Sequence, residues 1–447
     1  MLEGGERIAL DRGHIGYSFA FIEDAEIFED ARVELRVGAK TVEGIIASIA
    51  SGRIIIAVEE DFGEILARCI LVIDNTALLE ALKERLEKSA GDGRQLNVAL
   101  ANDVVANSGE AVSASNLPLF DVVIVDEASM VMLPALYYAA GLAREKVVVS
   151  GDFRQLPPII ATEQKEIRDQ IGLDVFHAAG IVSAVESKKG LSRLVMLDEQ
   201  HRMGDTICRL ITSFMYSGKL RTSAATRARG TGIPIPLSSP LTIIDTSSLW
   251  PFETQTPSFS RYNLVHALVV RNLSLKLQES GHIKDAGSLG ICTPYSAQAK
   301  LVRRLIDDEG LGRAVEAGTV HRYQGDEKTT IVIDIPESIG GGQFLGRFLQ
   351  GDHPDDDGAK LFNVAISRAR EHLVVVANLT YLDDRIPGGA FLRDILFQMQ
   401  SSGETLDARE ILTLHEADLR ELGQTVDIDL EAQRTGLFGQ KDFDTVF

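Results

Sequence analysis

Between residues 17 and 58, apolar and polar positions alternate along the chain, as at Val33, Leu35 and Val37. This period of two is typical of a strand with one buried face, because successive side chains point to opposite sides of a sheet. Glycines interrupt the alternation repeatedly and mark turns. The pattern predicts short antiparallel strands that form a small β-barrel-like module over residues 1–73.

The spacing of apolar residues becomes helical in residues 74–88, where Leu78, Leu79, Leu82 and Leu86 recur every few positions. Charged residues occupy the intervening positions, so one face of the predicted helix is apolar. The polar residues that begin the segment are of the types that cap helix N-termini. We therefore expect an amphipathic stalk helix of about four turns.

Five short apolar runs follow, with helix-compatible segments between them. Runs of this kind are typical of strands that are buried on both faces of a parallel sheet. The five are Phe120–Val125, Val147–Val149, Leu289–Cys292, Ile331–Ile335 and Leu373–Ala377. They predict the α/β fold class, with two parallel-sheet domains over residues 89–195 and 196–385. Polar or turn residues follow four of the runs at once, and ligands collect at the carboxyl ends of such strands.

The C-terminal part is acidic, and its pattern is helical from Leu392 to Leu422. We interpret residues 386–447 as a helical acidic tail, a candidate linker to a further domain, without a catalytic role. Residues 221–240 are rich in Thr, Arg, Gly, Ser and Pro and predict a loop.

Composition narrows the classes of protein. A chain of 447 residues predicts two to four domains, at about 100 to 200 residues each. With 45% hydrophobic and 25% charged residues it matches an ordinary globular protein and excludes disordered and fibrous classes. The net charge, 45 − 65 = −20, argues against binding nucleic acid by bulk charge but leaves room for a local basic groove.

No apolar stretch approaches the roughly 18 residues of a membrane span, and the first residues do not resemble a signal peptide. We therefore expect a cytoplasmic protein without a membrane partner. The three cysteines are far apart and lack the Cys-x-x-Cys spacing of a zinc site. Small buried apolar roles suit them best.

Two adjacent carboxylates, Asp126 and Glu127, end the first apolar run. Such a pair suits phosphoryl chemistry, with Asp126 holding Mg²⁺ and Glu127 orienting or deprotonating an attacking water. A solvated strand end explains the pair equally well when it is taken alone. Gln155 follows the second run after a Gly turn and precedes a Pro-Pro stop, a position from which a glutamine can contact a γ-phosphate.

Two arginines, Arg202 and Arg368, lie in short polar interruptions of apolar sequence. The planar guanidinium fork is suited to stabilising a transferring phosphoryl group. For either arginine alone, a surface salt bridge is the better interpretation.

Six segments, in family order, resemble the superfamily 1 helicases, and within them the group of the nonsense-mediated-decay helicase and senataxin. Asp126–Ser129 resembles motif II, Gly151–Pro158 motif III, and Glu199–Met203 the glutamine-aromatic-arginine segment. Thr293–Gln298 resembles motif IV, Gly318–Glu327 motif V, and Asn363–Arg370 motif VI. The resemblance implies two RecA-like domains preceded by a small antiparallel β-barrel and a stalk helix. It also implies coupling of ATP hydrolysis to movement on single-stranded DNA or RNA, 5′ to 3′.

The resemblance implies a role for each matching residue. Asp126 would bind Mg²⁺, Glu127 the attacking water and Gln155 the γ-phosphate of ATP, with Arg202 and Arg368 as arginine fingers. His201 would lie against the adenine and Glu327 near the ribose. The remaining nucleotide-site residues are Gly151, Asp152 and Gly325, and the residues that would face the nucleic-acid strand are Thr293, Pro294, Tyr295 and Thr319.

One family feature is absent from the sequence. The phosphate-binding loop, G-x-x-x-x-G-K-[ST], occurs nowhere in the chain. In the family it lies between the stalk helix and motif II, an interval that here, from Ser89 to Leu119, is only 31 residues long. That is about the length of a single βαβ unit, so the first RecA-like domain is expected to be truncated.

Three explanations are open for the missing block. The block was deleted from the gene or from its assigned reading frame, which is the explanation that we favour; or the protein is a naturally degenerate relative; or a partner chain supplies the block. Under all three, the chain alone is expected to be an inactive ATP hydrolase whose first sheet is short of strands and has an exposed edge.

Two functions from different classes therefore compete. The first is an ATP-dependent helicase or translocase. The second is a catalytically dead relative that binds nucleic acid or protein. A small-molecule kinase is disfavoured because nothing in the sequence resembles a second substrate pocket.

Overall fold

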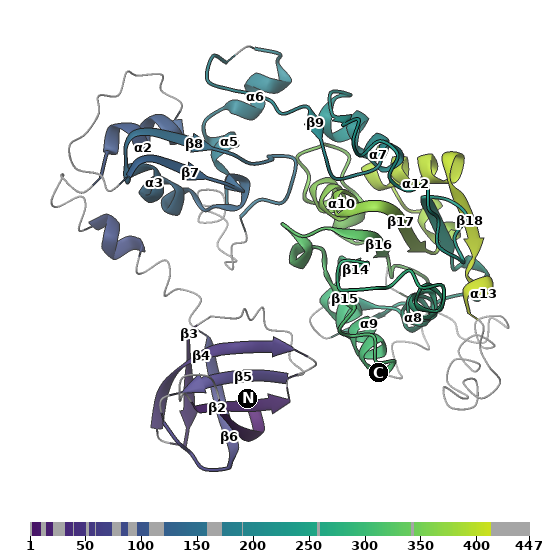
Figure 1. Cartoon of the computed structure of the whole chain (residues 1–447), viewed down its shortest axis with the longest axis horizontal. Helices are drawn as coiled ribbons and strands as arrows, with labels where there is room; N and C mark the ends of the chain where they lie inside the picture. The colour runs from purple at the N-terminus through teal and green to yellow at the C-terminus, as the bar shows by residue number, and fades with distance from the viewer. Residues whose placement is uncertain are drawn as a thin grey trace. The chain divides into compact units, whose positions relative to one another are not determined.

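The structure is a computed structural model of the chain (Figure 1). It describes residues 2–9, 15–20, 32–38, 40–50, 53–58, 60–73, 82–87, 96–106, 120–158, 172–189, 191–256, 260–340 and 344–412. The chain divides into two compact units, Met1–Leu194 and Val195–Phe447. Each unit is described by itself below.

The N-terminal module is a closed antiparallel barrel with the strand order β1-β2-β5-β4-β3-β6, as the alternating pattern predicts. Its strands are β1 (Leu2–Ala9), β2 (Ile15–Ala20), β3 (Arg32–Val37), β4 (Lys40–Ala50), β5 (Arg53–Val58) and β6 (Ile65–Ile73). Inward-facing side chains such as Tyr17, Phe19 and Ile54 are fully buried and form its core. Gly5 of β1 leaves the space that the Phe19 ring fills, since a Cβ there would lie 2.2 Å from the ring.

Residues 82–87 form a helix with Leu82 buried. The rest of the predicted stalk, residues 74–81 and 88, lies outside the described residues.

The rest of the first unit contains a short parallel sheet. Its elements are α2 (Val98–Ala106), β7 (Phe120–Val125), η2 (Ala128–Met130), α3 (Leu133–Gly141), β8 (Ala143–Val149), α5 (Val175–Ala178) and α6 (Ile181–Glu186). Strands β7 and β8 pair in parallel, and in the described part of the unit no third strand joins them. Val125 and Val149 pack with α3 and α6 residues in one apolar cluster, so one face of the sheet is covered.

The other face of this sheet is bare: none of the described residues packs over it. Phe120, Val122 and Ile124 alternate along β7 and are exposed, and Val148, which lies opposite Ile124, is exposed on β8. The prediction that these two runs are buried on both faces is therefore wrong in the described structure. That the first domain lacks strands stays a prediction, because residues 107–119 and 159–171 lie outside the described residues.

The second unit is built on six strands that are all parallel, in the order β15-β14-β16-β17-β11-β18. They are β11 (Leu241–Asp245), β14 (Leu289–Thr293), β15 (Val315–Thr319), β16 (Lys328–Asp334), β17 (Ala369–Ala377) and β18 (Glu404–Asp407). The three predicted runs in this unit, in β14, β16 and β17, are almost wholly buried, as expected.

Helices cover both faces of this sheet (Figure 1). The helices α7 (Asp205–Tyr216), α10 (Asp357–Ser367) and α12 (Phe391–Ser402) contact one another on one side. On the other side lie α8 (Leu264–Glu279), α9 (Ser296–Asp308) and α13 (Ala408–Ile411). The unit also contains the short segments β9 (Glu199–Gln200), β10 (Arg221–Thr222), η3 (Ser247–Leu249), β12 (Thr254–Gln255), β13 (Arg261–Tyr262), η4 (Val320–Tyr323), η5 (Arg347–Leu349) and α11 (Leu379–Asp383). The α/β class and the RecA-like sheet are confirmed.

The predicted helical tail is wrong over Glu404–Asp407. This segment forms β18, which extends the sheet beside β11, because its alternating residues find a paired neighbour in Thr242–Asp245. The preceding helix α12 is packed into the unit through buried residues such as Leu392 and Met399. Residues 413–447 lie outside the described residues.

Among the described residues, no helix combines the length and apolar character that crossing a bilayer requires.

The bare face of β7 and β8 predicts self-association. We expect the average mass of the purified chain to rise with concentration in light scattering, because exposed apolar sheet faces and edges pair readily. The double variant Ile124→Thr, Val148→Thr keeps β propensity, removes apolar surface, and should shift the chain toward monomer. Ile65→Thr, at an exposed apolar position of the barrel, is the matched control. A wild-type chain that remains monomeric at every concentration would contradict the prediction.

Candidate active site

The ends of β7 and β8 are joined by main-chain hydrogen bonds. The Ala128 N–H donates to the Ser150 carbonyl at 2.9 Å, and the Ser150 N–H donates to the Val125 carbonyl at 2.8 Å. These bonds hold the segment Asp126–Ser129 against Ser150–Asp152 at the carboxyl edge of the sheet. The structure therefore brings the two predicted carboxylates and the predicted Gly-Asp turn together.

The main chain at this junction is tightly constrained. Glu127 has φ 49° and ψ 37°, a left-handed conformation that is uncommon for a residue other than glycine and that often marks a functional site. Gly151 packs so closely that a Cβ there would lie 2.9 Å from the Ala128 nitrogen. A glycine is required at position 151 because the two strand ends could not otherwise approach.

The side chains of Asp126 and Glu127 are exposed at this edge. Among the described residues neither carboxylate has a hydrogen-bond or ion-pair partner, so both are available to a ligand. Oxygen donors of this kind fit Mg²⁺, which is bound in phosphoryl-transfer sites through one or two carboxylates together with water and phosphate oxygens. The donor set thus fits the predicted metal.

Asp152 fixes the predicted γ-phosphate residue. One of its carboxylate oxygens accepts a hydrogen bond from Gln155 Nε2 at 3.1 Å, and the other accepts one from the Arg154 N–H at 2.9 Å. Arg154 in turn donates to Glu186 of α6 at 2.8 Å. The Asp152 carboxylate therefore fixes the orientation of the Gln155 amide close to the junction of β7 and β8.

A cluster of charges lies at the amino edge of the second sheet, where β16 and β17 begin. Arg202 Nε donates to Glu327 Oε2 at 2.9 Å, and Arg370 Nη1 lies 3.6 Å from Glu327 Oε1. The Gly204 N–H donates to the Arg370 carbonyl at 2.8 Å and so anchors the Arg202 loop to β17. Arg229 Nη1 donates to the Arg202 carbonyl. Two guanidinium groups thus flank the Glu327 carboxylate, and a third, Arg229, fixes the main chain of Arg202; the excess of positive charge is suited to an anion.

A type II turn delivers Glu327 to this edge. Gln324 has φ −67° and ψ 128°, Gly325 has φ 85°, and the Asp326 N–H donates to the Tyr323 carbonyl at 3.1 Å. Gly325 is exposed, and its positive φ explains the glycine. His201 is also exposed and lies 3.5 Å from Glu199. The structure therefore places His201, Arg202 and Glu327 in one region of the unit.

Arg368 is placed differently. It is 1% exposed, and its guanidinium group donates to the carbonyl oxygens of Val364 and Asp326, both at 3.3 Å. It ties α10 to the turn before β16. The conformation described here does not present Arg368 at the surface beside Arg202, and the sequence missed the two arginines that are there, Arg229 and Arg370. In the sequence Arg370 follows Arg368 by two residues, and this repeated arginine was a signal that could have identified Arg370.

The residues expected to face a nucleic-acid strand are mostly buried. Thr293 is 1% and Tyr295 8% exposed, and Pro294 is buried between them, whereas Thr319 is half-buried. The first three side chains are therefore not at the surface in this conformation, and Arg261 and Phe348, which follow β11 and β16, pack against the Tyr295 ring. Their contact with a strand stays a prediction. Thr293 and Thr319 nevertheless end the neighbouring strands β14 and β15 at the carboxyl edge.

A buried polar cluster underlies this edge. The Tyr295 hydroxyl donates to Glu337, and Arg261 Nη1 donates to Glu253 at 2.7 Å. Gly346 covers the first pair, since a Cβ there would lie 2.0 Å from the Tyr295 hydroxyl. Burial is the main cause that raises the pKa of Glu337, to about 8, and it also raises the pKa of Glu253.

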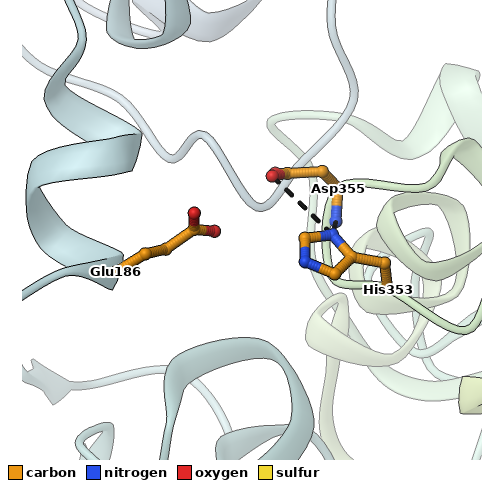
Figure 2. Close-up of side chains that lie close together, drawn as sticks. All are labelled: Glu186, His353 and Asp355. Atoms are coloured by element: carbon orange, nitrogen blue, oxygen red, sulfur yellow. Dashed lines mark hydrogen bonds and ion pairs between the residues drawn. The ribbon is translucent and has the colours of Figure 1, made fainter.

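A histidine and a carboxylate also lie together on the loop before α10 (Figure 2). His353 Nδ1 lies 3.8 Å from Asp355 Oδ2 and accepts a hydrogen bond from the Asp355 N–H at 3.2 Å. The Asp356 carboxylate accepts the His353 N–H at 2.8 Å, so hydrogen bonds within the loop hold it in shape. Glu186, which Figure 2 also draws, belongs to the other unit and is the Arg154 partner described above.

Comparison with known proteins agrees with this geometry. Two AAA domain families match the chain, one over residues 183–380 and one over residues 105–163. The DNA polymerase alpha-associated DNA helicase A of Saccharomyces cerevisiae is 29% identical over 287 residues, which cover 60% of this chain and 39% of that protein. These matches support a superfamily 1 helicase.

A second relative, the DNA-binding protein SMUBP-2 of Mesocricetus auratus, is 27% identical over 343 residues, or 75% of this chain and 32% of that protein. The chain thus spans about two fifths or less of the length of these relatives. The solved Arterivirus nonstructural protein 10 (helicase) aligns with 83% of this chain and 78% of its own, at 14% identity and a TM-score of 0.33. A TM-score this low establishes no common arrangement of domains, and the fold of this helicase relative follows from its own strand order.

The close approach at Gly151 generates a stability prediction. Gly151→Ala should destabilise the first unit by about 1–3 kcal/mol, because the added methyl group must push apart two hydrogen-bonded strand ends. We expect a lower midpoint in thermal unfolding followed by circular dichroism. Gly388→Ala, where a Cβ meets no atom within 4 Å, is the control. Equal midpoints for the two variants would contradict the packing argument.

The buried Glu337 predicts a pH dependence of stability. In the folded chain its pKa is raised from 4.5 to about 8, so it keeps its proton while the unfolded chain loses it. Stability should therefore fall as the pH rises from about 4.5 to about 8. The variant Glu337→Gln stays neutral, can still accept the Tyr295 hydrogen bond, and should flatten this slope in denaturant titrations. Parallel pH profiles for the variant and the wild type would contradict the prediction.

Proposed function

We propose that this chain is the motor part of a superfamily 1 helicase or translocase, a class that couples ATP hydrolysis to movement on single-stranded DNA or RNA in the 5′ to 3′ direction. The chain alone, whose sequence contains no phosphate-binding loop, is expected to be inactive. The observation that carries the proposal is the junction of β7 and β8. There, two unpaired carboxylates, a left-handed Glu127 and an oriented Gln155 meet at the carboxyl edge of a parallel sheet, where such folds bind ligands.

The side chains divide the chemistry as follows. Asp126 holds Mg²⁺, which would neutralise charge on the phosphates, and Glu127 accepts a proton from the attacking water or orients it. Gln155 contacts the γ-phosphate, and Asp152 keeps its amide oriented. All of these side chains lie at one edge of the sheet, so each has only a short distance to span to a phosphate bound there.

The second unit supplies positive charge. Arg202 acts as an arginine finger, His201 contacts the adenine and Glu327 contacts the ribose. Arg370 holds the other oxygen of the Glu327 carboxylate, at 3.6 Å, and so keeps Arg202 from being fully neutralised. Arg368 acts by positioning: it fixes the turn that carries Glu327 through its bond to the Asp326 carbonyl.

The absent phosphate loop supports a second function for the isolated chain. Without the backbone cradle and lysine of that loop, nucleotide binds weakly and turnover is lost. The chain then acts as a binding module for nucleic acid or protein, or it awaits the missing block from a partner chain. The bare face of β7 and β8 supports a missing block, since parallel sheets are normally covered on both sides.

The decisive experiment measures ATP turnover by the purified chain, with and without a single-stranded oligonucleotide. We expect no turnover above that of the Glu127→Gln variant, together with measurable binding of single-stranded DNA or RNA. Glu127→Gln removes the proposed base while keeping size, so it reports contaminating hydrolase activity. Arg202→Ala serves as a second inactive control.

Strand-stimulated turnover that both substitutions abolish would contradict the predicted inactivity and establish that another segment replaces the phosphate loop. A chain that neither hydrolyses ATP nor binds single strands would contradict the proposed function itself.

A further inference from the structure

Two aromatic side chains stand exposed at the carboxyl edge of the second sheet. Trp250, the single tryptophan of the chain, is 48% exposed, and Phe344 is 79% exposed. They follow β11 and β16 of the sheet in which β14, the neighbour of β16, ends in Thr293 and β15, the neighbour of β14, ends in Thr319. Large aromatic side chains at the surface offer ring faces against which a base can stack.

Trp250 is held in a strained main-chain conformation. Its φ of 49° lies in the left-handed region, which a bulky side chain adopts only when its surroundings impose it. The Trp250 N–H donates to the Ser247 carbonyl at 3.3 Å, and the Ser247 hydroxyl donates to Asp245 at 2.6 Å and Asn378 at 3.0 Å. The loop is therefore fixed to the ends of β11 and β17, and its tryptophan points outward.

The chain after Trp250 is also strapped down. The Ser338 hydroxyl donates to the Pro251 carbonyl at 2.7 Å, and the Glu253 N–H donates to the Ile339 carbonyl at 2.8 Å. The two extended segments run side by side in parallel through a bridge between Phe252 and Ile339. Trp250 thus rests on a rigid base on both sides.

Phe344 is attached to the same base. Arg261 Nη2 donates to the Phe344 carbonyl at 2.9 Å, while Nη1 of the same guanidinium donates to Glu253 at 2.7 Å. Because Trp250 lies three residues from Glu253, the buried polar cluster under this edge anchors both aromatics. A basic side chain follows, since Arg347 is well exposed and lies 5.0 Å from the centre of the Phe348 ring.

We propose that Trp250 and Phe344 form a base-stacking surface for single-stranded nucleic acid, with Arg347 contacting the phosphate backbone. This inference rests on the proposed function and names the residues that carry its strand binding. Aromatic rings held rigidly at a sheet edge bind bases of any sequence, because every base offers a π face. The buried Tyr295 then supports this surface from below.

The single tryptophan allows a direct test. We expect oligo-dT or oligo-U to quench the intrinsic fluorescence of the full chain, because a stacked base lies against the indole. Fluorescence anisotropy of a labelled strand should show about tenfold weaker binding for Trp250→Ala and for Phe344→Ala. Trp250→Phe retains a ring and should keep most of the affinity. Phe397→Ala, at a 67% exposed phenylalanine on α12, is the matched control and should bind like the wild type.

The outcomes separate this inference from the proposed function. Normal strand binding with unquenched tryptophan, and unchanged affinity in Trp250→Ala and Phe344→Ala, would overturn the stacking surface and leave the helicase assignment standing. Loss of binding in Trp250→Phe and Phe397→Ala as well would mean that the substitutions damage the protein generally. That result would also overturn the stacking surface. Absence of binding by the wild type would overturn both proposals.

Discussion

A parallel β-sheet must be covered on both faces, because its strands are apolar on both sides. The second unit satisfies this constraint with α7, α10 and α12 on one face and α8, α9 and α13 on the other, and its central strands are almost fully buried. The first unit satisfies it on one face only. Ile124 and Val148 are exposed there. This exposure corresponds to the short interval before motif II, which leaves few residues to cover the sheet.

The second sheet separates two kinds of chemistry onto its two edges. At the amino edge, Arg202 and Arg370 flank Glu327 and Arg229 holds the Arg202 main chain, an excess of positive charge suited to phosphate. At the carboxyl edge, neutralised and buried groups such as Glu337 form a rigid base for exposed aromatics. Because the strands are parallel, the two edges lie a full strand length apart, so nucleotide and nucleic-acid strand need not compete for one surface.

This arrangement also makes the proposed strand binding compatible with an acidic chain. A net charge of −20 opposes bulk attraction to a polyanion. Stacking on Trp250 and Phe344 requires little net charge, because its energy comes from contact between π faces. The proposed contribution of charge is local, at Arg347.

The sequence by itself determined the family, the α/β class, the barrel and the missing phosphate loop, since these depend on local periodicity and on residue types at fixed spacing. It placed Asp126, Glu127 and Gln155 at one sheet edge, where the structure has them. It could not determine that Tyr295 is buried, that Arg368 points inward, or that β18 joins the sheet. Those features depend on which segments pack over one another, and only the tertiary structure decides that, because burial and partner choice arise between residues far apart in the chain.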